Sequence, residues 1–209
     1  MKMKNKVLFV FIVLLMSVRS FAQELPVEYF SSPVVWLGLD YSHTKMIGAQ
    51  GFSNPDQIVT YYFENWNKLV MTESGKYDLN NHLVANVTID LKHVRAKNKT
   101  VDHKTMVVEE AAPFTDALLE EIVSGYDSTG LSGFGAMMIV EAYNKNMETA
   151  TYHFVVLDLE SQTIIYKKKY TTAPSGFGFR NYWAATFLRA LKGVENDLNS
   201  ILWNSKKPK

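Results

Sequence analysis

The amino-acid sequence predicts an α+β protein whose sheet is mostly antiparallel, ends in a C-terminal three-strand meander and is backed by two or three helices. Two patterns lead to this prediction. Apolar residues recur every three or four positions over residues 55–72 and 179–203, which is typical of helices that pack one face on a core. Strand-like runs lie close together at 136–143, 150–159 and 163–172, and their short separators favour antiparallel hairpins.

The first elements are expected in the N-terminal third of the chain. Residues 34–47 are rich in β-branched and aromatic types, which predicts a strand. A helix follows over residues 55–72. Ser53 and Asp56 form an S-x-x-D capping box at its start, and Gly75 lies just beyond its end.

The middle of the chain gives the weakest pattern. Apolar residues alternate over 84–91, and the short run 106–108 offers them a partner. We expect an antiparallel strand pair here, with the polar residues 95–104 as its turn.

A short helix is expected next, over residues 116–124. Thr115 is its predicted N-cap, and Gly125 is expected to end it in the left-handed conformation. The long final helix then closes the fold as one wall of the core. The third strand of the meander, 163–172, carries Lys167–Lys169, and consecutive lysines suit an edge strand that is protected against further pairing.

Residues 1–22 have the three-part layout of a cleavable export signal. Three lysines in the first six residues precede an apolar run over 7–18, and small residues lead up to Ala22, so cleavage is expected before Gln23. A membrane anchor is the alternative, although the run is shorter than the roughly 20 residues of a spanning helix. Residues 23–209 are expected to form a single domain in the periplasm or outside the cell.

Composition argues against several partners and cofactors. Removing residues 1–22 takes away four basic residues and no acid, so the formal charge of +1 becomes −3, and an acidic domain binds nucleic acid poorly. The chain has no cysteine, which excludes disulfides, thiolate metal sites and a lipoprotein-type lipid anchor. The histidines lack metal-ligand spacing, so neither a metal nor another cofactor is expected. No second apolar stretch predicts a transmembrane span.

No catalytic motif emerges, and no catalytic residue is assigned. The glycines between Gly130 and Gly135 follow the order G-x-x-G-x-G without the lysine of a phosphate-binding loop, so they are expected to make turns. An enzyme is therefore not expected. The open alternative is a secreted hydrolase whose acid and base groups come from strand ends, such as Asp40, His43 and Asp158.

One candidate surface is the segment 175–183, which joins the last strand to the last helix. A helix start presents unpaired N–H groups, and the two glycines allow another backbone to approach closely. The candidate ligand- or partner-binding residues are Gly176, Gly178, Arg180, Asn181 and Trp183. The alternative is that the aromatic residues fill the core and that Arg180 neutralises a buried acid such as Asp158.

The second half of the chain also shows the layout of known domains. A glycine-led strand (GFGAMMIVEAYNK) leads to a strand that ends in aspartate (YHFVVLDLESQT), then to a third strand (IIYKKKYTT), a glycine-rich loop and a helix. This order resembles the envelope α/β domains of the CsgG, LpoB and TolB N-terminal type. The segment GFGFRNYWA and the FAQ cleavage site are similar to those of secreted proteins from the Bacteroidetes group.

The resemblance is best over residues 133–191. It implies a helix-backed sheet and a non-catalytic envelope role, with an envelope protein or a small envelope component as the partner. The chain departs from CsgG and LpoB because it lacks their lipoprotein cysteine, and no pore-forming hairpins are apparent. A secretion channel is therefore not expected.

Overall fold

Strand β5 (Phe134–Asn144) is the centre of the sheet in the computed structural model, which describes residues 25–207. Along one edge, β5 pairs in parallel with two strands that lie end to end, β1 (Pro33–Asp40) and β2 (Lys45–Ile47). Along its other edge, β5 pairs antiparallel with β6 (Thr149–Asp158). The central strand therefore joins a parallel half of the sheet to an antiparallel half.

Three further strands complete the seven-stranded sheet. β3 (Asn86–Ile89) lies parallel to β1, β4 (Val107–Val108) lies parallel to β2, and β7 (Thr163–Thr172) lies antiparallel to β6. Within residues 25–207, β7 pairs with β6 alone, so Lys167–Lys169 occupy an edge strand as predicted.

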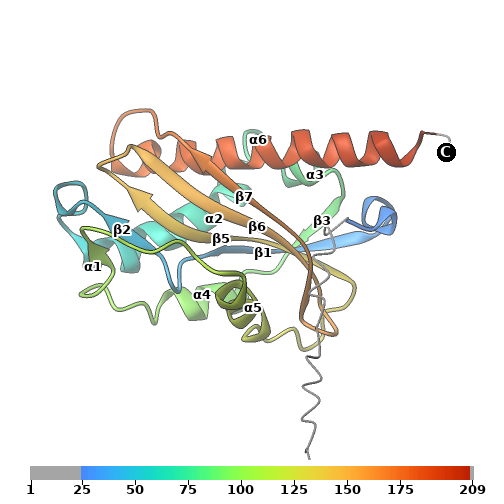
Figure 1. Cartoon of the computed structure of the whole chain (residues 1–209), viewed down its shortest axis with the longest axis horizontal. Coiled ribbons are helices and arrows are strands. Elements are labelled where there is room, and N and C mark those ends of the chain that lie inside the picture. The colour runs from blue at the N-terminus through green and yellow to red at the C-terminus, as the bar shows by residue number, and fades with distance from the viewer. Residues whose placement is uncertain (1–24, 208–209) are drawn as a thin grey trace, which may run out of the picture.

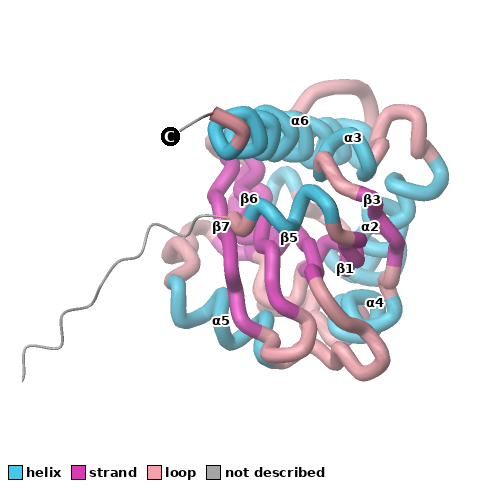
Figure 2. Tube along the Cα trace, turned by 90° about the vertical axis from the view of Figure 1, so that its right-hand side faces the viewer, coloured by secondary structure: helices cyan, strands magenta, loops and turns pink. Residues whose placement is uncertain are grey.

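Helices cover both faces of the sheet, as Figures 1 and 2 show. α6 (Phe179–Ser205) and α3 (Leu79–Leu83) lie on one face. α4 (Lys92–Asn98) and α5 (Asp116–Ser124) lie on the opposite face. No helix within residues 25–207 combines the length and the apolar character needed to cross a bilayer.

The predicted first helix is present in three consecutive segments. α1 (Pro55–Gln57) continues into a π-helical turn (Ile58–Tyr62) and then into α2 (Phe63–Thr72). Its N-cap is Asn54 rather than Ser53, because the Asn54 side chain accepts a hydrogen bond from a first-turn backbone N–H at 3.3 Å.

The prediction of a mostly antiparallel sheet is wrong. The strands in the order β3-β1-β5-β2-β4 are all parallel, and only the meander β5-β6-β7 is antiparallel, as predicted. Residues 135–143 of β5 are buried throughout, which is typical of a strand with helices over both faces. The strand expected over residues 34–47 is two strands, because the chain leaves the sheet at 41–44 and returns as β2.

The middle of the chain also differs from the prediction. Residues 84–91 and 106–108 do not pair, since β3 and β4 lie beside different strands, and α4 takes up the first part of the supposed turn 95–104. Thr115 caps α5 as predicted, with its Oγ1 accepting from a first-turn N–H at 3.2 Å. Gly125 ends that helix at φ −83°, outside the left-handed region.

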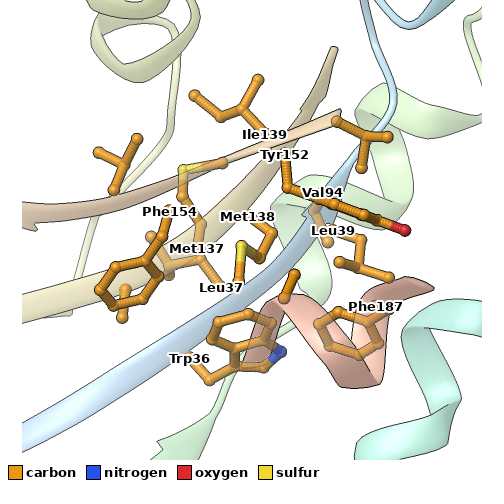
Figure 3. Packing of buried hydrophobic residues seen from close by; sticks show 14 of the residues in the cluster. Trp36, Leu37, Leu39, Val94, Met137, Met138, Ile139, Tyr152, Phe154 and Phe187 are labelled. Atoms are coloured by element: carbon orange, nitrogen blue, oxygen red, sulfur yellow. The ribbon is translucent and has the colours of Figure 1, made fainter. Parts of the chain in front are cut away.

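The core lies on both faces of the sheet, under α6 on one and under α4 and α5 on the other, and Figure 3 shows part of it. Trp36 of β1 stacks on Phe187 of α6 with ring centroids 6.2 Å apart, and Tyr77 stacks on the same ring at 5.5 Å. The apolar stripe of the last helix therefore packs inward, as predicted. Its buried members include Trp183, Phe187, Leu191, Val194 and Leu198.

Candidate functional site

The candidate segment 175–183 lies at one end of the molecule, where three loops meet, on the left in Figure 1. These are residues 48–54, the β5–β6 turn 144–148 and residues 173–178, which precede α6. Tyr182, in the first turn of α6, ties two of them together. Its hydroxyl accepts from Lys145 Nζ at 3.0 Å and donates to Glu148 Oε1 at 3.0 Å.

The loop 173–178 is held in place at several points. Arg189 donates to the carbonyl oxygen of Ala173 and, at 2.9 Å, to Ser175 Oγ. The backbone N–H of Ser175 donates to the carbonyl of Tyr182 at 3.3 Å. Gly176 and Gly178 have φ values of 100° and 79°, which side-chain-bearing residues rarely adopt. The glycines therefore make the turns of a well-anchored loop.

Between the two glycines, Phe177 is exposed to solvent over 96% of its surface. A second apolar side chain, Met147 in the β5–β6 turn, is 71% exposed. Lys145, Glu148 and Tyr182, which are hydrogen-bonded to one another, supply polar groups at the same end of the molecule. We call Met147, Phe177 and these three residues the loop-end surface. This surface combines two exposed apolar side chains with three polar ones.

Arg180 does not pair with Asp158, so the predicted alternative named the wrong acid. Its Nη2 donates to Glu73 Oε1 at 2.7 Å, and its Nη1 donates to Asn181 Oδ1 at 2.9 Å. Glu73 is 34% exposed, so this ion pair is only half-buried. Asp158 lies at the β6–β7 turn, where hydrogen bonds from the backbone and hydroxyl of Ser161 lower the pKa of its carboxyl group.

Trp183 belongs to the core. It is buried and stacks on Tyr143 with centroids 4.7 Å apart and on Phe52 at 5.5 Å. Phe179 packs on Tyr62 at 4.7 Å beside a small cavity of about 150 Å³. Of the predicted site residues, Gly176, Gly178, Arg180 and Asn181 are at the surface, while Trp183 lies beneath it and is closed to a ligand.

Sequence reasoning did not place Phe177 and Met147 among the site residues. For Phe177 no decisive signal was available, because Phe134 also lies between two glycines, yet it begins β5 and contacts Tyr29. For Met147 no signal exists either. A methionine in a four-residue hairpin turn can equally well be a core residue.

The two acids of the hydrolase alternative do not come together. Asp40 lies opposite Ile139 on β5, whereas Asp158 lies opposite Phe134. Five residues along a strand separate the two positions by about 17 Å. His43 Nδ1 lies 2.9 Å from Ser42 Oγ, and this hydroxyl donates to Asp40 Oδ1 at 2.5 Å, so His43 is linked to Asp40 through Ser42.

Asp40 itself is fully engaged within the fold. Its carboxylate accepts hydrogen bonds from the Tyr126 hydroxyl at 2.7 Å and from the backbone N–H of Ser42 at 2.7 Å, and Lys97 Nζ lies 3.7 Å away. Only 1% of its surface is exposed. These contacts join the end of β1 to α4 and to Tyr126, which follows α5. Across residues 25–207, no cluster of His, Cys, Asp and Glu has the arrangement of a metal site.

The chain is similar to a known protein in structure but not in sequence. No protein-family model matches the chain, and no curated protein matches its sequence. Among solved structures, the chain is similar to the LpoB C-terminal domain from Salmonella enterica, in a selenomethionine form. The identity is 10% and the TM-score 0.32, with 70% of this chain and 94% of that chain covered. The similarity to Bacteroidetes proteins stays a prediction from sequence.

Proposed function

We propose that this chain is an exported, non-catalytic binding module of the cell envelope and that the loop-end surface recognises a protein partner. The observation that carries the proposal is Phe177, an aromatic side chain that is almost fully exposed on an anchored loop. Exposing an aromatic ring to water is unfavourable, and a protein partner would remove that cost by covering it. Export rests on the signal layout of residues 1–22.

The construction of the loop supports recognition over a purely structural role. Among the described residues, Phe177 packs on no other ring, whereas Phe179 and Trp183 nearby are both in ring contacts. The hydrogen bonds of Arg189 to Ala173 and Ser175 fix the loop before any partner arrives. A preorganised loop loses little conformational entropy on binding, which favours affinity.

The size of the nearby cavity favours a protein over a small molecule. The cavity beside Phe179 holds about 150 Å³. Pockets for small ligands usually hold about 300–1,000 Å³. The loop-end surface instead protrudes, and aromatic and methionine side chains are enriched at protein–protein interfaces.

The proposal is tested by capturing partners from envelope extracts with the mature chain and its Phe177→Ala variant. We expect Phe177→Ala to lower capture of a specific partner at least about tenfold, as for an interface anchor, and to leave thermal stability unchanged. The matched control is Trp203→Ala, because Trp203 is also an exposed aromatic residue but lies at the other end of α6. Equal capture by wild type and Phe177→Ala would refute the proposal.

A further inference from the structure

The far end of α6 carries a second, chemically different surface. Trp203 is 69% exposed in the last turns of the helix, and the neighbouring Ile201 and Leu202 are half-buried. Lys206 and Lys207 follow, both exposed, and within residues 25–207 neither forms an ion pair. Residues 198–207 contain no aspartate or glutamate. This end of the helix therefore combines an aromatic ring with uncompensated positive charge.

The described chain begins at the same end. The 3-10 turn Val27–Ser31 contacts α6, and Val27 is 54% exposed there. Figure 1 shows this turn on the right, beneath the C-terminal part of α6. Val27 therefore adds an exposed apolar side chain to this end of the molecule.

We infer that the Trp203 end of the molecule binds an anionic lipid surface. Tryptophan is enriched at membrane interfaces because its ring is apolar and its N–H is polar. Exposed lysines beside it are attracted to anionic head groups, and they lose that attraction in high salt. The inference rests on the proposed export of the chain and not on the role of Phe177.

The geometry of α6 relates this end to the loop-end surface. α6 spans 27 residues, from just after Phe177 to just after Trp203. At a rise of 1.5 Å per residue, the two exposed aromatic side chains lie about 40 Å apart along the helix. A molecule that rests on lipid through Trp203 would therefore present Phe177 on the side that faces away from the membrane.

The test uses the mature chain from Gln23 and sedimentation with vesicles. We expect binding to vesicles of phosphatidylcholine mixed with phosphatidylglycerol, little binding to pure phosphatidylcholine, and release at high salt. Lys206→Gln and Lys207→Gln should each lower the partition coefficient about fivefold. Trp203→Ala should lower it at least about tenfold, since it removes the ring that enters the interface.

Two matched controls separate this inference from the proposed function. Lys192→Gln alters an exposed lysine of the same helix away from its end, and Phe177→Ala alters the opposite end; both should bind vesicles like wild type. Equal binding to both vesicle types, or unchanged binding by Trp203→Ala, would overturn the inference. Lipid-free capture of a protein that depends on Trp203 would overturn it as well, by assigning this end to a protein.

Discussion

Asn67 of α2 and Asn98 of α4 donate hydrogen bonds to the same atom, the carbonyl oxygen of Leu39, at 3.0 and 2.9 Å. β3 pairs with β1 only as far as Trp36, so the outer edge of β1 lacks a neighbouring strand beyond that residue. The two amide groups replace the missing strand. Their Oδ1 atoms also accept from the backbone N–H groups of Leu39 and Tyr41, both at 2.8 Å.

Loss of either amide should destabilise the fold. Asn67→Ala and Asn98→Ala each leave buried backbone groups of β1 without a partner, which costs about 1–3 kcal/mol. Chemical denaturation measures the effect. Asn199→Ala, an exposed position on α6, is the matched control and should leave the midpoint unchanged. An unchanged midpoint for both buried variants would mean that these hydrogen bonds contribute nothing.

Gly38 should tolerate no side chain. Its φ is 105°, and an added Cβ would lie 2.6 Å from Asn67 Oδ1 and 2.7 Å from Val94 Cγ1. Backbone strain and overpacking together predict a loss of about 2–5 kcal/mol for Gly38→Ala. Gly75→Ala is the control, because nothing lies within 4 Å of its added Cβ. Thermal melting of both variants compares them, and equal melting temperatures would contradict this account.

Arg180→Ala should change stability little, by at most about 1 kcal/mol, because its pair with Glu73 is only half-buried. Its carbonyl, which accepts from Trp66 Nε1 at 3.0 Å, is unaffected by the change. Phe187→Ala should cost about 3–5 kcal/mol, since the ring is buried between Trp36 and Tyr77. Urea denaturation measures the loss of unfolding free energy for each variant, and the loss for Phe187→Ala should be the larger. A large loss for Arg180→Ala would show that its ion pair is a major support of the fold.

Glu141 should make stability depend on acidic pH. Burial raises the pKa of its carboxyl group, but hydrogen bonds from His153, Lys169 and the backbone of Phe114 outweigh burial, so the pKa lies below its ordinary value of 4.5. A lowered acid pKa stabilises the folded state above 4.5, and this contribution is lost as the pH falls through the folded-state pKa.

Glu141→Gln removes that contribution, so its difference in unfolding free energy from wild type should shrink as the pH falls below 4.5. Denaturation at a series of pH values measures this difference. Glu120→Gln, the same substitution at an exposed position of α5, is the matched control. A difference for Glu141→Gln that is independent of pH would contradict the assignment.

The export signal lies outside the described residues and stays a prediction. Processing before Gln23 should give a mature protein whose N-terminal sequence begins there. Ala22→Arg should block cleavage and leave a precursor in the membrane fraction, while the neighbouring Gln23→Glu should be processed normally. Recovery of wild-type chains that still begin at Met1 would contradict the prediction.

The sequence was most informative where structure is local. The hairpins of β5, β6 and β7, the helices that begin at Pro55, Asp116 and Phe179, and the Thr115 cap depend on residues a few positions apart, and they were predicted. The pairing of β1 with β5 joins distant segments, and alternation of residues does not reveal strand direction. The continuous apolar run of β5 was the available signal for a parallel sheet.

The predictions for the candidate site also depend on whether a feature is local or involves a distant residue. Gly176 and Gly178 were expected to allow another backbone to approach closely, and in the structure they turn the chain at positive φ. The partner of Arg180 was not predicted correctly, because Glu73 comes from a loop more than a hundred residues away. No periodicity within the segment indicates which acid the folded chain brings to that place.

The pairing of β1 with β5 has a consequence for the time course of synthesis. Trp36 lies beside Ala136, one hundred residues later in the chain. A chain that emerges N-terminus first can pair β1 with β3, but the other edge of β1 stays open until β5 appears. The strands of the meander pair within one continuous segment and need no such delay. During this interval the nascent N-terminal half is the part of the protein most in need of a chaperone.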